Sequence, residues 1–400
     1  MTQWEVRPLG EVCRVVNGGT PKTSVPEFWG GEHRWITPAE MGKRSSPYVS
    51  DTSRKLTNLG LSNCSASSSS PYSVILSTRA PIGYLVINTE PMATNQGCRT
   101  LVPGESVNHK FLYYYLSSIR DVLDAFGTGA TFRELSAGVL KGITIPVPPL
   151  PEQQRIVEIL DEAFEGIAAA RQNAEKNLRN ARALFESHLQ LSVTRQGEGW
   201  VETSLGAETD LLAGFAFKSP QYTTLEEGVR LLRGDNIVQG ALRWDDAKRW
   251  PASDVAEYER YQLRAGDVVL AMDRPWVSAG LKRARISEDD LPSLLVQRTA
   301  RLRGNSRLDN RFLVYLISSS AFADHILGVQ TGLGVPHISG QQIKDFRFQR
   351  PPLDEQLEIA DQLDALADAT LRLESIYQRR LSTLDELKQS LLHQAFTGQL

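Results

Sequence analysis

The sequence predicts a duplicated protein of α/β or α+β class, in which two globular domains alternate with two long helices. Three observations support this prediction: the chain repeats itself with a period near 200 residues, two segments carry apolar residues in steps of three and four, and a Pro-Pro pair precedes each segment. We divide the 400 residues into a globular domain at 1–150, a helix and linker at 151–199, a second globular domain at 200–350 and a second helix at 351–400. A chain of this length exceeds what one hydrophobic core usually holds.

The repeat consists of identical residues at a slowly drifting offset. With a shift of 196 residues Trp4 falls on Trp200, and with a shift of 203 residues Gln153 falls on Gln356. The drift corresponds to small insertions, which surface loops tolerate. Because the period is far longer than a solenoid unit, the sequence predicts a duplicated two-part module.

Each globular domain mixes short buried strands with an amphipathic helix. Residues 74–76 and 268–270 are apolar runs bounded by turn-forming residues, which is typical of buried strands. Residues 110–123 and 310–326 carry apolar side chains at helical spacing, which predicts helices with one face in the core. Alternating apolar residues at 143–147 predict a strand that ends at the Pro-rich linker.

The two long helices carry apolar seams of the coiled-coil type. The first seam is rich in Ala and the second places Leu or Tyr at the matching positions, so that small side chains face large ones. We therefore predict an antiparallel helix pair, with the globular domains at opposite ends and related by a pseudo-twofold axis. The alternative is that each helix packs on its own domain. The predicted helix-pair interface consists of Ile156, Leu160, Ala163, Ile167, Ala170, Ile359, Leu363, Leu366, Leu373 and Tyr377.

Charge and composition exclude several classes of protein. The formal net charge is −3, which divides into +4 on the two globular segments and −7 on the two helical segments. Phosphate binding depends on where the cations lie, so this balance leaves room for a local basic face. Three cysteines argue against a disulfide scaffold, and we expect neither a signal peptide nor a membrane span. The expected location is the cytoplasm.

The sequence lacks the common catalytic motifs. It contains no phosphate-binding GxxxxGK[ST] motif, and residues 127–132 match only part of GxGxxG. No Asn-Pro-Pro-aromatic or Asp-Pro-Pro-aromatic tetrapeptide of an amino-methyltransferase is present. The six histidines never cluster at metal-ligand spacing, and the acid pairs at 245–246 and 289–290 have no partnering base nearby in the sequence. The sequence therefore predicts a non-catalytic chain without a bound metal ion.

Several phrases of the sequence resemble a known family. They are ITIPVPPLPEQQRI at residues 143–156 with its echo PPLDEQ at 351–356, STRAPIG at 77–83, NQG at 95–97, GTGATF at 127–132 followed by ELS at 134–136, and QAFTG at 394–398. Together with the duplication, they are similar to the specificity subunit of type I restriction–modification systems. The resemblance covers essentially the whole chain.

This resemblance implies a division of labour among subunits. In that family each globular part is a target recognition domain that reads one half of a split DNA sequence, and the paired helices hold the two readers at a fixed separation. Two methyltransferase subunits dock on the helices, and restriction/translocase subunits join them. S-adenosylmethionine, ATP and magnesium are therefore expected in the partner subunits, and no cofactor is expected in this chain.

We predict the DNA-contacting residues from polar loops that offer hydrogen-bond donors to base edges or phosphates. In the first domain they are Arg79, Asn95, Gln96, Arg99, Thr131 and Arg133, and in the second they are Arg233, Asn236, Arg274, Gln297, Arg298 and His337. The loops at 79–83 and 274–278 differ in sequence. The two half-sites should therefore differ, and the full target should be asymmetric.

Two other classes of function remain open at this point. The first is a recognition unit with hidden nuclease or methylase activity of its own, which predicts metal-dependent cleavage or a bound S-adenosylmethionine. The second is a non-catalytic scaffold without DNA. A scaffold predicts that affinity for DNA stays flat as salt rises, whereas a DNA reader loses affinity steeply.

Overall fold

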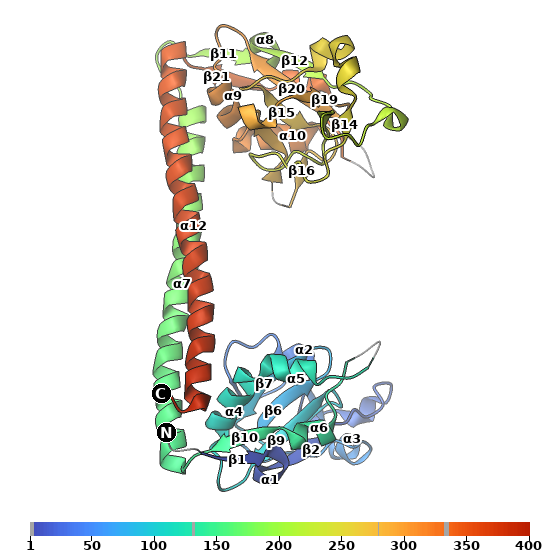
Figure 1. Ribbon diagram of the computed structural model, residues 1–400, viewed down its shortest axis with the longest axis vertical. Coiled ribbons are helices and arrows are strands. Elements are labelled where there is room, and N and C mark those ends of the chain that lie inside the picture. Colours follow the sequence, from blue (N-terminus) through green and yellow to red (C-terminus); the bar gives the residue numbers. More distant parts are fainter. Residues whose placement is uncertain (1–3, 130–132, 279, 332–335) are drawn as a thin grey trace. The chain divides into compact units, whose positions relative to one another are not determined.

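The computed structural model describes residues 4–129, 133–278, 280–331 and 336–400. The chain divides into two compact units (Figure 1): the first contains residues 1–175 and 378–400, and the second contains residues 176–377. Each unit therefore holds one globular domain together with parts of both long helices.

The globular part of the first unit is built from two sheets and short helices. Among its described residues, one sheet has the order β2-β9-β6-β7-β4, a second has the order β5-β3-β8, and β1 pairs with β10. The strands are β1 (Glu5–Pro8), β2 (Cys13–Asn17), β3 (Trp29–Ile36), β4 (Tyr48–Val49), β5 (Arg54–Leu56), β6 (Val74–Thr78), β7 (Ile82–Asn88), β8 (Met92–Thr94), β9 (Cys98–Pro103) and β10 (Thr144–Val147). The helices are α1 (Leu9–Val12), η1 (Pro26–Phe28), α2 (Pro38–Met41), α3 (Asn58–Ser62), α4 (His109–Ser118), α5 (Arg120–Ala125) and α6 (Ala137–Gly142).

The globular part of the second unit has a corresponding set of elements. Its strands are β11 (Val201–Ser204), β12 (Thr209–Ala213), β13 (Val229–Leu232), β14 (Arg249–Trp250), β15 (Val268–Ala271), β16 (Trp276–Val277), β17 (Gly280–Leu281), β18 (Arg283–Arg285), β19 (Ser293–Leu295), β20 (Thr299–Gly304) and β21 (Arg347–Arg350). Its helices are α8 (Leu205–Glu208), η2 (Ser219–Gln221), η3 (Ala252–Tyr261), η4 (Glu288–Asp290), α9 (Asn310–Leu316), α10 (Ser320–Val329) and α11 (Gly340–Lys344).

The sheet topology confirms the predicted duplication. The order β12-β20-β15-β18 repeats β2-β9-β6-β7, the order β14-β13-β19 repeats β5-β3-β8, and the pair β11-β21 repeats β1-β10. The central strands β6 and β15 are buried along their whole length, which confirms the strands predicted at 74–76 and 268–270. β6 pairs antiparallel with β9, with Val74 opposite Leu101, and β15 pairs antiparallel with β20, with Val268 opposite Leu302.

Two helices of 45 residues follow the globular domains, as predicted: α7 (Leu150–Thr194) and α12 (Leu353–Thr397). In the first unit they run antiparallel, because Arg171 lies 2.8 Å from Asp385 while Arg155, earlier in α7, donates to the main-chain oxygen of Leu400 at 2.7 Å. The helix portions in the second unit also lie side by side (Figure 1), and they are linked by an ion pair of 2.6 Å between Arg182 and Glu374.

The ten residues of the predicted helix-pair interface fall into three groups in the structure. Ala163, Ile167, Ala170, Leu366 and Tyr377 are half-buried along the helices. Leu373 is 41% exposed, so it does not lie on the buried face. The half-buried positions of α12 include the next residue, Glu374. The half-buried series reaches Tyr377 by a step of four residues followed by a step of three, whereas the predicted series used a step of three followed by a step of four.

The four remaining interface positions lie in the cores of the globular domains. In the first unit, Ile156 and Leu160 of α7 share one buried cluster with Leu392 and Ala395 of α12, and this cluster also contains Phe111 of α4. All five residues are at most 1% exposed. The core of the first domain is therefore completed by the start of one helix and the end of the other.

The second domain has the same arrangement with the helix roles exchanged. Ile359 and Leu363 of α12 share a buried cluster with Leu189 and Val193 of α7 and with Phe312 of α9. The helices thus pair with each other and also pack on the domains, which combines the two arrangements that the sequence left open.

In the described part of the chain, no single helix is long and apolar enough to cross a membrane. Helices α9 and α10 meet the length and hydropathy criteria only as a pair, and they are bent by 63° relative to each other.

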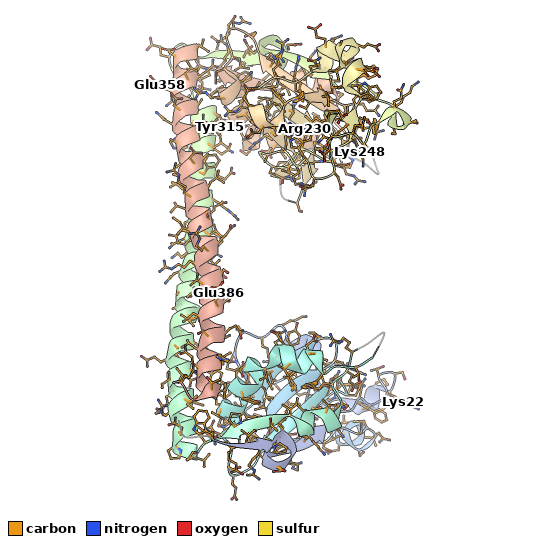
Figure 2. All side chains as sticks on the ribbon, viewed as in Figure 1. Lys22, Arg230, Lys248, Tyr315, Glu358 and Glu386 are labelled. Atoms are coloured by element: carbon orange, nitrogen blue, oxygen red, sulfur yellow. The ribbon has the colours of Figure 1, made fainter. Side chains whose placement is uncertain are left out.

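Each domain is also fastened to its own helix by a tyrosine. Tyr114 donates to a carboxylate oxygen of Asp161 on α7, and Tyr315 donates to Asp364 on α12 at 2.6 Å (Figure 2). Burial is the main cause that raises the pKa of both phenols above the ordinary value of 10.0, and the neighbouring carboxylate raises it further. The folded state therefore favours the neutral phenol.

This shift predicts a loss of stability in alkali. Below pH 10 both folded and unfolded phenols are neutral, so the contribution is complete; above pH 10 the unfolded phenols ionise first, and stability falls as the pH rises toward the folded pKa. We expect the free energy of unfolding, measured by urea at pH 8 to 10.5, to fall less steeply in Tyr315→Phe than in the unaltered chain. Tyr72→Phe, at a residue that is 53% exposed, is the control and should leave the slope unchanged.

Candidate nucleic-acid interface

A tight loop frame follows the central strand of the first domain. The N–H of Thr78 donates to the oxygen of Gly97 at 2.8 Å, and the N–H of Leu135 donates to the oxygen of Thr78 at 2.9 Å. The next residue, Arg79, forms an isolated β-bridge with Glu134. Three separate loops are therefore joined at the end of β6.

The second domain builds the same frame at the end of β15. The N–H of Met272 donates to the oxygen of Arg298 at 2.8 Å, and the N–H of Ile338 donates to the oxygen of Met272 at 2.9 Å. Asp273 forms the isolated bridge with His337. Arg298 thus takes the place of Gly97, Asp273 that of Arg79, and His337 that of Glu134.

Backbone strain marks the same point in both frames. Ala80 and Arg274, which follow the bridged residues, have φ of 51° and 44°. A left-handed conformation is unfavourable for residues with a side chain and persists where the surrounding structure enforces it, as at many functional sites. Arg298 also has a left-handed φ of 64°, whereas the first domain has a glycine at that position.

A carboxylate lies at the centre of each frame and holds cationic groups. In the first domain Glu134 lies 3.3 Å from Arg99 and 3.7 Å from Arg79. In the second domain Asp273 lies 2.7 Å from Arg298 and 2.5 Å from Nδ1 of His337. In the first domain the bridge joins Arg79 to Glu134, with the basic residue first in the sequence, and in the second domain it joins Asp273 to His337, with the acidic residue first. The two domains therefore present different donors and acceptors on the same backbone arrangement.

The frame of the second domain opens into a polar cavity of about 390 Å³. Four cations and two carboxylates line it, together with polar and aromatic groups: Arg233, Arg274, Lys282, Arg298, Asp235, Asp273, Gln297, Ser219, Tyr222, Phe217, Gly234 and Val296. Burial lowers the pKa of Lys282; the nearby Asp235 opposes this shift, and the cations Arg243 and Arg274 add to it. The excess of positive charge suits an anionic or acceptor-rich ligand.

Most predicted contact residues of the second domain meet at this cavity. Arg233, Arg274, Gln297 and Arg298 line it, and His337 reaches it through Asp273. Asn236 does not belong to this group: it is 6% exposed and its amide spans its own turn, accepting from the N–H of Arg233 and donating to the oxygen of Arg243, both at 3.0 Å. Asn236 therefore supports its own loop and does not line the cavity.

The predicted residues of the first domain differ in how far their side chains are engaged by their own loops. Arg79 is half-buried at the frame and Gln96 is exposed, where it accepts from the hydroxyl of Thr20. Asn95 accepts from the N–H of Gly97 at 3.1 Å, which closes its own turn. The Arg99 side chain is only 14% exposed and donates to the main-chain oxygens of Gln96, which precedes β9, and of Cys98, the first residue of β9. Asn95 and Arg99 therefore support the loop.

The last two predictions for the first domain have different outcomes. Arg133 donates to the carboxylate of Asp124 at 3.1 Å and to main-chain oxygens of the same turn, so its guanidinium holds the loop after α5. Thr131 lies outside the described residues. The central acids Glu134 and Asp273 are absent from the predicted site residues, because a carboxylate is not a donor to DNA and their ion pairs join loops that are distant in the sequence.

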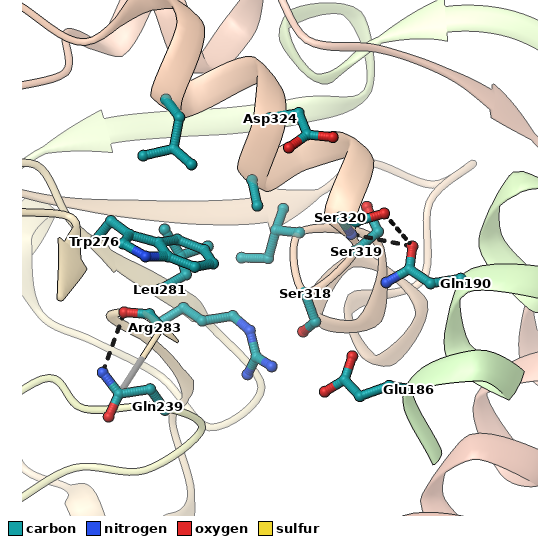
Figure 3. Close-up of a pocket in the computed structure, with 14 residues that line it drawn as sticks. Glu186, Gln190, Gln239, Trp276, Leu281, Arg283, Ser318, Ser319, Ser320 and Asp324 are labelled. Atoms are coloured by element: carbon teal, nitrogen blue, oxygen red, sulfur yellow. Dashed lines mark hydrogen bonds between the residues drawn. The ribbon is translucent and has the colours of Figure 1, made fainter. Parts of the chain in front are cut away.

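A second cavity, of about 350 Å³, lies beside the β16–β17 hairpin of the second unit (Figure 3). Arg283 points into it toward Ser318 and Glu186, and burial lowers the pKa of the Arg283 guanidinium to about 10. At the corresponding place in the first unit, Leu85 takes the register position of Arg283, and Arg120 of α5 lies over the Tyr84 ring. This difference again distinguishes the second domain from the first.

The arrangement supports binding more than catalysis. Among the described residues, no group of three or more His, Cys, Asp or Glu side chains is placed to hold a metal ion. The two frames instead offer guanidinium, amide and imidazole groups at the ends of rigid strands. Such groups can form hydrogen bonds to base edges and to phosphates.

Comparison with known proteins decides the family. A family described as "Type I restriction modification DNA specificity domain" matches residues 1–176 and 243–381. The chain belongs to this family. The resemblance found in the sequence is thereby confirmed, and the match to the type I specificity domain includes residues from both copies of the repeat.

Curated relatives of this type I specificity chain are similar over different lengths. The MjaIX specificity subunit of Methanocaldococcus jannaschii is 35% identical over 159 residues, which are 39% of this chain and 37% of that protein. The EcoAI specificity subunit of Escherichia coli is 36% identical over 187 residues, 46% of this chain and 31% of that protein. The chain thus spans about a third of these two relatives. The MjaVIII specificity subunit of M. jannaschii is 23% identical over 411 residues, 99% of this chain and 93% of that protein.

Solved structures have the same fold along the whole chain. One, from work on "complex assembly and conformational transition of the type I R-M system", has a TM-score of 0.80 at 19% identity and covers 100% of this chain and 99% of that chain. The HsdS subunit from Thermoanaerobacter tengcongensis has a TM-score of 0.63 at 19% identity and covers 100% of this chain and 98% of its own. These matches confirm the predicted class of two mixed domains and two long helices.

Proposed function

We propose that this chain is the sequence-specific DNA-binding subunit of a type I restriction–modification complex, and that each globular domain reads one half of a bipartite target. The observation that carries the proposal is the repeated loop frame with its exchanged charges. Arg79 and Glu134 in one domain correspond to Asp273 and His337 in the other. One scaffold with two sets of donors and acceptors reads two different sequences, so the target is asymmetric.

The chain itself catalyses no reaction and works with partner subunits. Two methyltransferase subunits dock on the paired helices, and restriction/translocase subunits join them in the cytoplasm. The acidic surface of the helices, which includes the exposed Glu358 and Glu386 (Figure 2), suits basic partner surfaces better than DNA. S-adenosylmethionine, ATP and magnesium bind in the partners, and the paired helices set the separation of the two half-sites.

Methylation mapping tests this proposal. Adenine methylation is compared by single-molecule sequencing between cells that express this chain with its methyltransferase and cells that lack only this chain. We expect methylation to disappear at one bipartite, asymmetric motif, because the methyltransferase has lost its DNA reader. Replacing residues 200–350 by the second domain of a relative should then change one half of the motif and leave the other half unchanged.

The two other classes of function give different results. If the chain is a scaffold that does not read DNA, methylation of the motif persists in cells that lack the chain. The affinity of a scaffold for DNA also stays weak and constant as salt rises, whereas the logarithm of the affinity of a DNA reader with several phosphate contacts falls linearly with the logarithm of salt concentration. A hidden nuclease cleaves DNA when the purified chain is given magnesium alone. Either result contradicts the proposal.

A further inference from the structure

In each domain one arginine of the frame forms an ion pair with the central carboxylate and keeps part of its side chain exposed. The Arg298 side chain is 68% exposed, and its Nη1 lies 2.7 Å from Oδ2 of Asp273. The other oxygen of Asp273 accepts from Nδ1 of His337 at 2.5 Å. The carboxylate is therefore fixed on one side by imidazole and fixes the guanidinium on the other.

The Arg298 side chain remains largely exposed although its guanidinium is paired with Asp273. A guanidinium carries five N–H groups in a rigid fork, and the ion pair with Asp273 engages Nη1. Guanine offers the acceptors O6 and N7 side by side in the major groove, and two neighbouring N–H groups of one arginine bind both. Fixing the side chain beforehand removes part of the loss of rotamer entropy that binding would otherwise cost.

The same carboxylate disfavours a phosphate at this position. A phosphate oxygen that approached Arg298 would also approach the negative charge of Asp273, whereas the base edge of guanine is neutral. We expect other cations of the cavity, such as Arg233 and Lys282, to contact the DNA phosphates. The central acid thus separates base reading from backbone binding.

The first domain contains an equivalent arginine on the opposite side of its bridge. Arg79 is 36% exposed in its side chain and lies 3.7 Å from Glu134. Arg99, the other cation of this cluster, is 14% exposed and is already engaged by main-chain oxygens. Arg79 is therefore the side chain that remains available to DNA.

From this geometry we propose that each domain reads a guanine with one arginine that a carboxylate holds in place: Arg79 with Glu134 in the first domain, and Arg298 with Asp273 in the second. The proposal rests on the proposed function and adds the base that each half-site contains. Because the two arginines lie at different positions of the same frame, the guanine lies at a different position in each half-site. Asp273 and Glu134 are positioning residues, since they act through the arginines.

Arg298→Lys in the assembled methyltransferase complex tests the base assignment. Lysine keeps the charge and can still bind a phosphate, but its ammonium group lacks the rigid, planar fork with which arginine binds O6 and N7 of guanine together. We expect discrimination at one G·C pair of the second half-site to fall by about 10- to 100-fold, with the rest of the motif unchanged. Arg79→Lys should do the same at one G·C pair of the first half-site. Arg347→Lys, at a side chain that is 74% exposed on β21, is the matched control and should leave the motif unchanged.

Asp273→Asn tests the positioning role. The amide keeps the size of the side chain but releases Arg298, so discrimination should fall at the same G·C pair that Arg298→Lys affects, while affinity for unrelated DNA stays equal or rises because a negative charge has gone. An unchanged melting temperature separates this result from general unfolding.

Three results would overturn the inference and leave the proposed function standing: an Arg298→Lys complex with the motif of the unaltered chain, an affected pair that is A·T, or an equal loss of affinity for all sequences. Absence of any motif in the unaltered complex would instead contradict the proposed function itself.

Discussion

Replacing Leu392 by Ala, near the end of the chain, is expected to destabilise the first domain by about 2–5 kcal/mol, as buried Leu→Ala changes usually do. Leu392 is 1% exposed and lies in a buried cluster whose other members, apart from Ala395, all come from residues 9–160. The next turn of α12 adds Phe396, whose ring packs 5.1 Å from Phe111 and 5.2 Å from Tyr115. Deleting residues 391–400 should therefore unfold the first domain although every residue of 1–150 is retained.

Hydrogen exchange measured by mass spectrometry locates this effect. Peptides that contain β6 should lose protection in Leu392→Ala, and peptides that contain β15 should not, because the second domain takes its buried helix end from α7. Leu387→Ala is the matched control, since Leu387 lies on the same helix and is 45% exposed. Leu189→Ala should reverse the pattern, because Leu189 is 1% exposed in the core of the second domain. Equal loss of protection in both domains would contradict this assignment of the two cores.

Each domain core contains the start of one long helix and the end of the other, and this arrangement also explains how far the sequence could predict the fold. The repeat, the buried strands and the long helices follow from local patterns, and the structure confirms them. An apolar stripe does not reveal which surface it packs against: Ile156 and Leu363 were assigned to the helix pair and lie in domain cores. The predicted position of Leu373 failed because a helix of 3.6 residues per turn can continue one face by a step of three or of four.

For the site, the sequence could indicate which residues offer donors but not which donors are already used. Arg298 and Asn236 both lie in polar loops, yet the guanidinium of Arg298 is exposed and the amide of Asn236 is enclosed in its own turn. The central acids were missed for a related reason. Asp273 meets His337 across 64 positions of sequence, and a carboxylate near DNA is unfavourable unless a cation pairs with it.

A buried glutamine joins each domain to the start of its long helix, and replacing it is expected to have an effect as large as a core truncation. Gln153 is 0% exposed. Its Nε2 donates to the main-chain oxygens of Ser106 and Pro148, both at 2.8 Å, and its Oε1 accepts from the N–H of Asn108 at 2.8 Å. In Gln153→Leu, two oxygens and one N–H are left buried without these partners. At about 1–3 kcal/mol for each such group, we expect the free energy of unfolding of the first domain to fall by at least about 3 kcal/mol.

The repeat supplies an internal replicate of this experiment. Gln356 is also 0% exposed; it donates to the oxygens of Arg307 and Pro351 at 2.9 and 2.8 Å and accepts from the N–H of Asp309 at 2.9 Å. Because these contacts match those of Gln153 one for one, Gln356→Leu should destabilise the second domain by a similar amount. Hydrogen exchange should locate each effect in its own domain, and Gln154→Leu, at the exposed neighbour, is the control.

If Gln153→Leu leaves the first domain as stable as before, the hydrogen bonds do not fasten the helix, and the Glu-Gln pair that recurs at 152–153 and 355–356 needs another explanation. If both variants lose stability equally, the recurrence has a structural cause. A helix that begins directly after two prolines lacks a capping side chain of its own, and the buried glutamine then fixes its first turn by bonding to the domain's loop and to the main-chain oxygen just before it.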